Sequence, residues 1–554
     1  MGKKSNDLAK KIAGSQQMKP PREDGRGHKE ITRTPARLHR ALAGCFLFGG
    51  LLLIYSLDGL FAASNDCTPH VYGAVKLLKQ GSFTFTPEQD PRMFVWQLIL
   101  PDGKTSKLCF KKWDSQTSNL YRNGQLRVLE SLYFIVPSVR EDRYVNTFGI
   151  GPAISALPVF AVLDAATNGN LEDCPAVLWY GAKFVSSALV AGSAVLVFVI
   201  GLLFTSTRKA LLISLIYGLG TCVWSVSSQS LWQHGPNVFY LALGTYGLVR
   251  SGERRSYSIL CGAAYGMAVL CRPDSALVVL VVGVHLAAFQ RKSLLPFIAG
   301  GLPFALGLAI YNWHFLGSPL AFGQMELARH LSLSKTGMPG VWQTPLMVGL
   351  PGLLFSPSRG LLVYSPVLII AVWGTWVAWR DRRWAILRPL SIAILAVWII
   401  QAKYFDWWSG WSYGYRHIVD TTVFMAVLFL PVIDRIMTNR VLLAVLGLTT
   451  ALSVLIQVLG VTAYALADWN ARRAYIIVLP GGQGSRTILD KAEAEQLLET
   501  PGAVLVNTVA MDIDQPEYRY RLWSWRDSQI IYTLRHWSES RRARIANVQR
   551  WIKE

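Results

Sequence analysis

Long apolar runs recur along this 554-residue chain and constrain its fold more than any other feature. A helix that spans a bilayer needs about 20 apolar residues, because the hydrocarbon core is about 30 Å thick. Eleven runs approach this length, which predicts an all-α polytopic membrane protein. The runs are residues 41–57, 176–204, 210–228, 236–250, 257–271, 274–290, 294–315, 362–379, 386–403, 418–434 and 441–466.

The charged residues fit this class and predict an orientation. Only 16% of residues are charged, against roughly 25% in soluble domains. The formal charge of +21 is then first a topology signal, because Lys and Arg collect on cytoplasmic loops, and it does not indicate a nucleic-acid partner. Basic residues flank every second connection, on the side of the basic N-terminus. They are Arg208/Lys209, Arg250/Arg254/Arg255, Arg291/Lys292, Arg380/Arg382/Arg383/Arg388 and Arg435/Arg440.

This topology divides the chain into three parts. Residues 1–40 are expected to be a disordered, basic cytoplasmic tail that can lie on anionic lipid. Residues 41–466 form the transmembrane domain, with 58–175 as its first outer loop. Residues 467–554 form an outer, periplasmic module. The other outward connections are 229–235, 271–274, 316–361 and 404–417, and the Gly/Pro-rich part of 316–361 resembles a mobile gate.

Local patterns predict structure in the two large outer segments. In the first loop we expect a short helix at 69–80 and a strand or hairpin at 83–100 with a turn at 101–103. The apolar stretch 149–166 is interpreted as an interfacial helix, because a twelfth span would place every later basic loop outside. In the C-terminal module we expect strands at 475–480, 503–513 and 518–526, and helices at 491–499 and 536–554, which makes a small α/β unit.

Four short motifs lie one after another in segments on the inferred outer face. The first reads Asn65-Asp66-Cys67-Thr68-Pro69-His70-Val71-Tyr72, the second Phe148-Gly149-Ile150-Gly151-Pro152, the third Trp232-Gln233-His234-Gly235 and the fourth Trp411-Ser412-Tyr413-Gly414-Tyr415-Arg416.

Together these motifs resemble the GT-C superfamily of membrane glycosyltransferases, which use polyprenyl-phosphate sugars and include protein O-mannosyltransferases and the lipid A aminoarabinose transferase. The likeness is closest to bacterial members described as family 39-like, and it covers roughly residues 45–420. Asn65 stands where those members carry Gly, and Phe148-Gly149 where they carry Tyr-Pro.

The resemblance places the catalytic base on Asp66. An acceptor hydroxyl must lose a proton as it attacks the anomeric carbon, whereas a phosphate leaves without a general acid, so one carboxylate suffices and inversion is expected. Asp58 is a possible second carboxylate. The alternative for Asp66 is that it caps the helix that starts near Pro69.

The leaving phosphate needs fixed positive charge. Arg416 is the first candidate and Arg272 the second, followed by His234, Arg359 and Lys403. Trp232, Trp411 and Tyr415 are candidates to stack on sugar or acceptor, although tryptophans here are also typical of an interfacial belt. No cofactor is certain, and Mg²⁺ or Mn²⁺ held by an Asp near phosphates stays open. Cys67, Cys109 and Cys174 share the first outer loop, where a disulfide and free thiols are both compatible with the sequence.

The predicted function is transfer of a sugar from an undecaprenyl-phosphate donor, on the outer face of the bacterial inner membrane. The acceptor would be a cell-envelope glycan or glycolipid, such as O-antigen or the core of lipopolysaccharide, or a protein. Two alternatives are a flippase or transporter of lipid-linked sugars and a polysaccharide polymerase or ligase. No half-to-half repeat of the kind common in transporters is present in the sequence.

Overall fold

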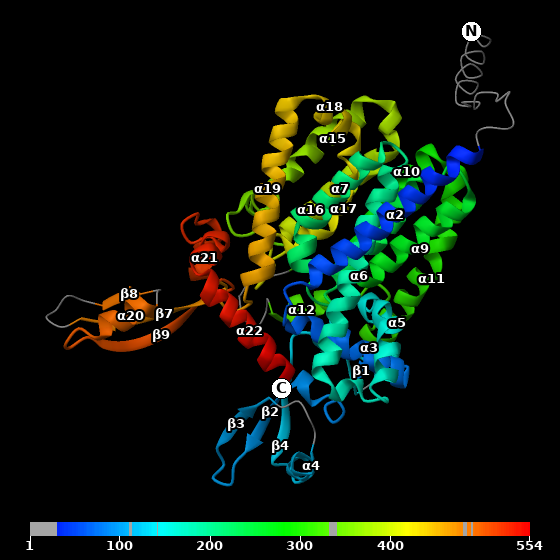
Figure 1. Cartoon of the computed structure of the whole chain (residues 1–554). Helices are drawn as coiled ribbons and strands as arrows, with labels where there is room; N and C mark the ends of the chain where they lie inside the picture. Colours follow the sequence, from blue (N-terminus) through cyan, green and yellow to red (C-terminus); the bar gives the residue numbers. More distant parts are fainter. Residues whose placement is uncertain are drawn as a thin grey trace. The chain divides into compact units, whose positions relative to one another are not determined.

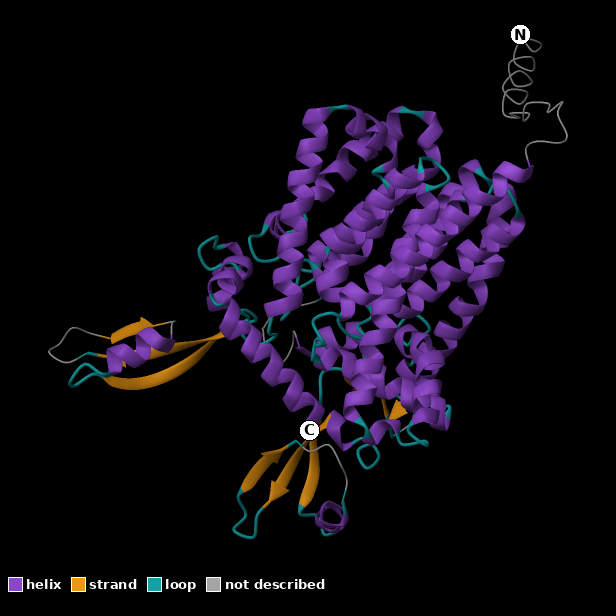
Figure 2. Cartoon of the chain, viewed as in Figure 1, coloured by secondary structure: helices purple, strands orange, loops and turns teal. Residues whose placement is uncertain are grey.

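The computed structural model describes residues 30–109, 114–140, 142–331, 341–479, 485–488 and 491–553. The chain divides into two compact units, Met1–Phe46 and Leu47–Glu554. The described part is mostly helical, with strands confined to three small sheets (Figures 1 and 2).

The longer described helices follow the predicted apolar runs closely, because apolar side chains are stable where helices pack against one another or face lipid. Their bounds are α2 (Glu30–Ser56), α5 (Gly151–Ala166), α6 (Pro175–Gly201), α7 (Thr207–Gly220), α8 (His234–Val249), α9 (Arg255–Cys271), α10 (Ala276–Phe289), α11 (Arg291–Leu316), α13 (Leu346–Phe355), α15 (Ile370–Arg380), α16 (Arg388–Lys403), α17 (Thr422–Val427), α18 (Leu430–Thr438) and α19 (Arg440–Ala463).

Five described helices are long and apolar enough to cross a membrane, namely Arg37–Ser56, Pro175–Gly201, Arg291–Leu316, Arg382–Lys403 and Arg440–Ala463. A sixth candidate is the pair Arg416–Val427 and Leu430–Thr438, which is bent by 62°. The protein is therefore an integral membrane protein. The number of eleven spans stays a prediction, because several of the expected runs form helices of 17 residues or fewer or are broken by short turns.

The first helix begins earlier than the sequence pattern predicted. Helix α2 starts at Glu30, so residues 30–40 are helical rather than part of a disordered tail. Arg, Ala and Leu are good helix formers, and the apolar run that follows extends the helix without a break. The rest of the predicted tail, 1–29, lies outside the described residues.

The loop after α2 is an ordered α/β structure built on antiparallel pairing. Its sheets have the orders β1-β6-β5 and β3-β2-β4. The predicted hairpin is present, since Leu100 donates its backbone N–H to the Lys104 carbonyl at 2.8 Å around the 101–103 turn. The elements are α3 (Thr68–Gln80), β1 (Thr84–Phe85), β2 (Phe94–Ile99), β3 (Thr105–Leu108), α4 (Ser115–Arg122), β4 (Leu126–Ser131), β5 (Ile135–Pro137) and β6 (Tyr144–Asn146).

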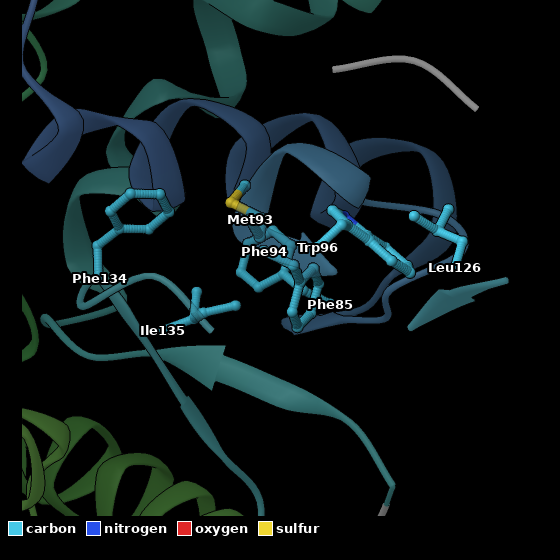
Figure 3. Packing of buried hydrophobic residues seen from close by; sticks show 7 residues of the cluster. All are labelled: Phe85, Met93, Phe94, Trp96, Leu126, Phe134 and Ile135. Atoms are coloured by element: carbon cyan, nitrogen blue, oxygen red, sulfur yellow. The ribbon is translucent and has the colours of Figure 1, made fainter. Parts of the chain in front are cut away.

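A cluster of buried apolar side chains gives this loop its own core. The members shown in Figure 3 come from β1, the 3-10 helix Pro91–Met93, β2, β4, and β5 with the residue before it. Trp96 also donates its indole N–H to the Pro91 carbonyl at 3.1 Å. The cluster consists of Phe85, Met93, Phe94, Trp96, Leu126, Phe134 and Ile135.

The second motif is a point of close helix packing. A Cβ atom at Gly149 would clash with the backbone carbonyls of Leu270 and Cys271, and one at Gly151 would clash with Cys271. Only glycine permits this approach, so the start of α5 rests on the end of α9. The 316–361 segment also contains structure, namely α12 (Gly323–Leu331) and α13, whereas 332–340 of the predicted gate lies outside the described residues.

The C-terminal segment contains a sheet with strand order β8-β7-β9, in which β7 and β9 match two predicted strands and β8 was not predicted, and it contains both predicted helices. The expectation of a strand at 518–526 is wrong, because Pro516–Trp523 forms a 3-10 helix in which Arg521 is buried and donates to the carbonyls of Met511 and Trp469, each at 2.8 Å. The other elements are β7 (Ala471–Val478), β8 (Ser485–Ile488), α20 (Lys491–Leu498), β9 (Val504–Asp512), α21 (Gln529–Arg535) and α22 (Trp537–Lys553). All seven cysteines of the chain are free thiols.

A buried ion network connects the two ends of the second unit. Asp58, just after α2, lies 2.6 Å from Lys183 Nζ of α6 and 3.1 Å from Arg544 Nη2 of α22. The Asp58 side chain is only 3% exposed. Its carboxylate therefore compensates two buried cations, which is a structural role.

We expect Asp58→Asn to destabilise the protein, since it leaves both cations without their anion. Losing one partner of a buried ion pair costs about 3–5 kcal/mol. The measurement is thermal unfolding in detergent, with Asp102→Asn as control because Asp102 is about half exposed in a surface pair with Lys104. Equal melting temperatures for the two variants would contradict the structural role.

Candidate functional site

Asp66 lies at the centre of a polar cluster between the α2–α3 connection and the turn after α16. It occupies a 3-10 turn, Asn65–Cys67, that leads into α3. Its Oδ2 atom is 2.5 Å from Arg416 Nη1, and its Oδ1 atom accepts a hydrogen bond from the Tyr133 hydroxyl at 2.6 Å. The capping alternative is not what the structure shows, because Cys67 is the N-cap residue of α3 and no side chain caps the helix.

Tyr133 reaches Asp66 from the loop core. It precedes Phe134, which is buried in the cluster of Figure 3, so the backbone next to the phenol is anchored by apolar packing. Partial burial and the neighbouring carboxylate of Asp66 raise the pKa of Tyr133. The phenol therefore stays protonated at neutral pH and donates to the carboxylate.

Arg416 is held on three sides. Its Nη2 donates to the Ser409 carbonyl at 2.8 Å, and its guanidinium carbon lies 4.5 Å from the ring centroid of Trp232. A cation over an aromatic face is stabilised by the ring quadrupole. The buried Nε of Arg416 has no hydrogen-bond partner among the described residues. The Arg416 and Asp66 side chains are 14% and 20% exposed, so the pair is accessible to a ligand.

The turn that holds Arg416 is strained. Ser409 has φ +67° and is followed by Gly410 at φ +52°. A positive φ is unfavourable for a residue with a Cβ, and such strain gathers at functional sites. Asp406 Oδ1 accepts the Gly410 backbone N–H at 2.9 Å and so closes the turn. Burial and the nearby Asp514 carboxylate raise the pKa of Asp406 to about 8.

This pKa predicts a pH effect on stability. A carboxyl whose pKa is higher in the folded chain stabilises the fold while it is protonated, and this stability falls as pH rises from about 4 towards 8. We expect Asp406→Asn, which mimics the protonated form, to flatten the fall of the melting temperature between about pH 5 and 8. Asp434→Asn, at a largely exposed carboxylate, should keep the wild-type slope. An unchanged slope in Asp406→Asn would contradict the argument.

A second cluster lies directly behind the first. Arg272 contacts Asp420 and lies 3.0 Å from Asp274, and its Nη1 donates to the His417 carbonyl at 3.1 Å. His234 Nδ1 is 3.2 Å from Asp420 Oδ2 and 3.2 Å from Arg272 Nη1. The carboxylates of Asp274 and Asp420 thus neutralise Arg272. His417 links the two clusters, because it follows Arg416 in the chain and its carbonyl accepts from Arg272.

Neither Arg359 nor Lys403 contacts Asp66 in the structure. Every N–H group of Arg359 can be assigned to the protein, since its nitrogens donate to the carbonyls of Ser358, Trp408 and Gly410 and to the side chains of Asn470 and Gln529. This buried arginine organises the junction with the C-terminal segment. Lys403 ends α16, and its ammonium has no partner among the described residues.

The three aromatic candidates are mostly committed to packing. Trp232 is 4% exposed and carries Arg416 on its face. Tyr415 is buried and shares a 2.7 Å hydrogen bond with Ser365. Trp411 donates its indole N–H to Asp512 at 2.9 Å and packs against the apolar cluster of Trp407, Trp408 and Trp469. We therefore assign none of these three side chains a role in stacking on a sugar.

Sequence reasoning missed several members of the site. Tyr133, Ser409 and Asp420 were not candidates, because nothing in their local pattern marks them. The only available signal was the short spacing of Asp420 after Arg416. His70 of the first motif is buried, and Asn146 Nδ2 lies 3.1 Å from its ring nitrogen Nδ1.

The residues present do not form a metal site around Asp66. Across the part of the chain that the structure describes, no group of three or more His, Cys, Asp or Glu side chains could hold a metal ion.

The chain is similar to solved structures of the GT-C superfamily. ArnT from Cupriavidus metallidurans, solved with undecaprenyl phosphate, is 11% identical over 76% of this chain and 70% of its own, with a TM-score of 0.41. The archaeal oligosaccharyltransferase from Archaeoglobus fulgidus is 12% identical in its apo form, over 74% of this chain and 56% of its own, with a TM-score of 0.42.

The same oligosaccharyltransferase, AglB, in complex with an inhibitory peptide and a dolichol-phosphate, is 10% identical over 75% of this chain and 55% of its own, with a TM-score of 0.43. This chain thus spans little more than half the length of AglB. No protein-family model and no curated protein sequence matches the chain. These neighbours belong to the superfamily that the motifs resemble, and similarities of this size carry no argument about substrate or mechanism.

Proposed function

We propose that this protein is an inverting glycosyltransferase that moves a sugar from a polyprenyl-phosphate carrier, undecaprenyl phosphate in a bacterium, to an acceptor hydroxyl. The observation that carries the proposal is the contact of Asp66 with Arg416 and Tyr133, in which a carboxylate, a guanidinium and a phenol meet. A base and a phosphate-binding cation, held side by side next to membrane helices, are what this reaction needs.

Each group has a part in the proposed reaction. The acceptor oxygen forms a bond to the anomeric carbon while the bond from that carbon to the phosphate oxygen breaks. Asp66 takes the hydroxyl proton, which makes the acceptor oxygen a better nucleophile. The bonding electrons leave with the phosphate, whose negative charge Arg416 stabilises with hydrogen bonds aimed at it.

The remaining residues position these two groups. Tyr133 fixes the rotation of the Asp66 carboxylate, and Trp232 and Ser409 fix the guanidinium of Arg416. Arg272, neutralised by Asp274 and Asp420, supports His234 and His417 behind Arg416 and is assigned no direct contact with phosphate. Such preorganisation avoids the cost of reorienting dipoles during the reaction.

The acceptor and the side of the membrane complete the proposal. We propose a cell-envelope glycan or glycolipid as acceptor, with a protein as the less favoured choice, on the outer face of the bacterial inner membrane. The basic cytoplasmic connections support this orientation, because the large loop at 58–175 and the C-terminal segment then lie outside together. Asp66, Tyr133 and Arg416 all belong to connections on that side.

We expect Asp66→Asn to lower kcat for transfer about 10²–10⁴-fold, the usual contribution of a general base. Tyr133→Phe should cost less, about tenfold, because it removes one hydrogen bond to a charged group. The measurement is turnover of purified protein with radiolabelled undecaprenyl-phosphate sugars. Asp102→Asn, on the exposed hairpin turn, is the matched control. Near-normal transfer by a folded Asp66→Asn variant would remove Asp66 as base.

A reporter fusion tests the orientation. A reporter inserted at residue 170, between α5 and α6, should be extracytoplasmic, whereas one inserted at residue 253, between α8 and α9, should be cytoplasmic. The measurement is the activity of a periplasm-dependent reporter, such as alkaline phosphatase, in cells. A cytoplasmic signal at residue 170 would mean that α5 spans the bilayer and that the site faces the other side.

A further inference from the structure

A cleft of about 650 Å³ is lined in part by the chain segment that leads to the proposed base. Its first wall is the segment just before Asp66, and its second is the connection after α19 together with the start of β7. The remaining walls are α21 and α22, including the C-terminal turns of α22. Asn65 lines the cleft and is the chain neighbour of Asp66. Consecutive Cα atoms are about 3.8 Å apart, so the cleft and the base share one stretch of backbone.

More basic than acidic side chains line the cleft. Arg472, Arg473 and Arg550 line it against two carboxylates, Asp468 and Glu539. Both carboxylates have protein partners, since Asp468 accepts from the Tyr532 hydroxyl at 2.9 Å and Glu539 lies 3.3 Å from a ring nitrogen of His536.

Two of the arginine side chains in the cleft are available to bind a ligand. Arg473 on β7 and Arg550 on α22 are exposed, and neither has a hydrogen-bond or ion-pair partner among the described residues. Arg472, by contrast, lies over the Tyr532 ring at 4.9 Å and 3.7 Å from Asp527. The cleft therefore offers two guanidinium groups on elements far apart in the sequence.

Aromatic side chains line the same space. Tyr475, Tyr532 and Trp551 contribute to the walls, and Trp551 is held in place by an edge contact with Trp179 at 5.2 Å. Aromatic faces suit the apolar faces of sugar rings, whereas planar guanidinium groups suit phosphate and carboxylate.

We propose that this cleft binds the acceptor, and that the acceptor is a glycan that carries an anionic group, a phosphate or carboxylate, recognised by Arg473 and Arg550. This proposal rests on the proposed function and narrows it to one substrate class. It also gives the C-terminal segment a role, since every arginine of the cleft comes from that segment. The anionic group would hold the glycan while a neighbouring hydroxyl reaches Asp66 past Asn65.

The test is direct binding to the full chain in detergent, measured by native mass spectrometry with synthetic probes. The probes are a glucosamine disaccharide with one phosphate, offered with and without fatty acyl chains, and the same two molecules without phosphate. We expect the phosphorylated probes to bind at least tenfold more tightly than their phosphate-free partners. Dependence on the acyl chains would identify a glycolipid acceptor, and equal binding without them a soluble glycan; both agree with the proposal.

Variants make the test specific. The double variant Arg473→Ala/Arg550→Ala should bind the phosphorylated probes at least tenfold more weakly, with lysine at both positions restoring part of the loss. Arg486→Ala, an exposed arginine on β8 outside the cleft, is the matched control. The proposal is overturned if phosphate makes no difference, if wild type binds no phosphorylated probe, or if the folded double variant binds like wild type.

These experiments distinguish a failure of the acceptor-site proposal from a failure of the proposed transferase function. If wild type binds the phosphorylated probes through Arg473 and Arg550 but consumes no polyprenyl-phosphate sugar, the cleft is an anionic-glycan site and the transferase assignment fails. If donor sugar is transferred but KM for a phosphorylated acceptor is unchanged in the double variant, the transferase stands and the acceptor site lies elsewhere.

Discussion

The ion pair between Asp66 and Arg416 joins two segments that are 350 residues apart in the chain, and the site is arranged around it. A carboxylate and a guanidinium lose hydration when they are partly buried, so each must be compensated by nearby groups. Tyr133 and the Ser409 carbonyl provide hydrogen bonds, and Trp232 provides an aromatic face. Their positions come from the core of the first loop, from the strained turn at Ser409 and from the start of α8.

The other buried charges follow the same rule with a different result. Asp58 is enclosed by Lys183 and Arg544, and Arg272 is enclosed by Asp274 and Asp420. In these clusters the protein itself satisfies the charge, so little capacity is left for a ligand. The pair of Arg416 and Asp66 differs because the two side chains are 14% and 20% exposed, whereas those of Arg544, Asp58, Arg272 and Asp420 are at most 6% exposed. That difference distinguishes a candidate binding pair from structural ones, although the three arginines look alike in the sequence.

Local sequence patterns predicted much of the fold. The run at 386–403 became α16 (Arg388–Lys403), and the run at 441–466 became α19 (Arg440–Ala463). The expectation failed at 518–526, where alternating aromatic and basic residues indicated a strand. Buried hydrogen bonds of Arg521 to Met511 and Trp469 stabilise a 3-10 helix there instead. Contacts with residues distant in the chain decided that element, and no local window contains them.

The sequence by itself determined the membrane class and most helix positions, because apolar periodicity is a local property, and its motifs made Asp66 and Arg416 candidates through a resemblance. Only the tertiary structure decided which charged residues meet. It paired Asp66 with Arg416 and Tyr133, surrounded Asp58 with cations, and placed Arg473 and Arg550 in a cleft beside Asn65. The physical reason is that electrostatic compensation depends on distance in space, and distance along the chain does not encode it.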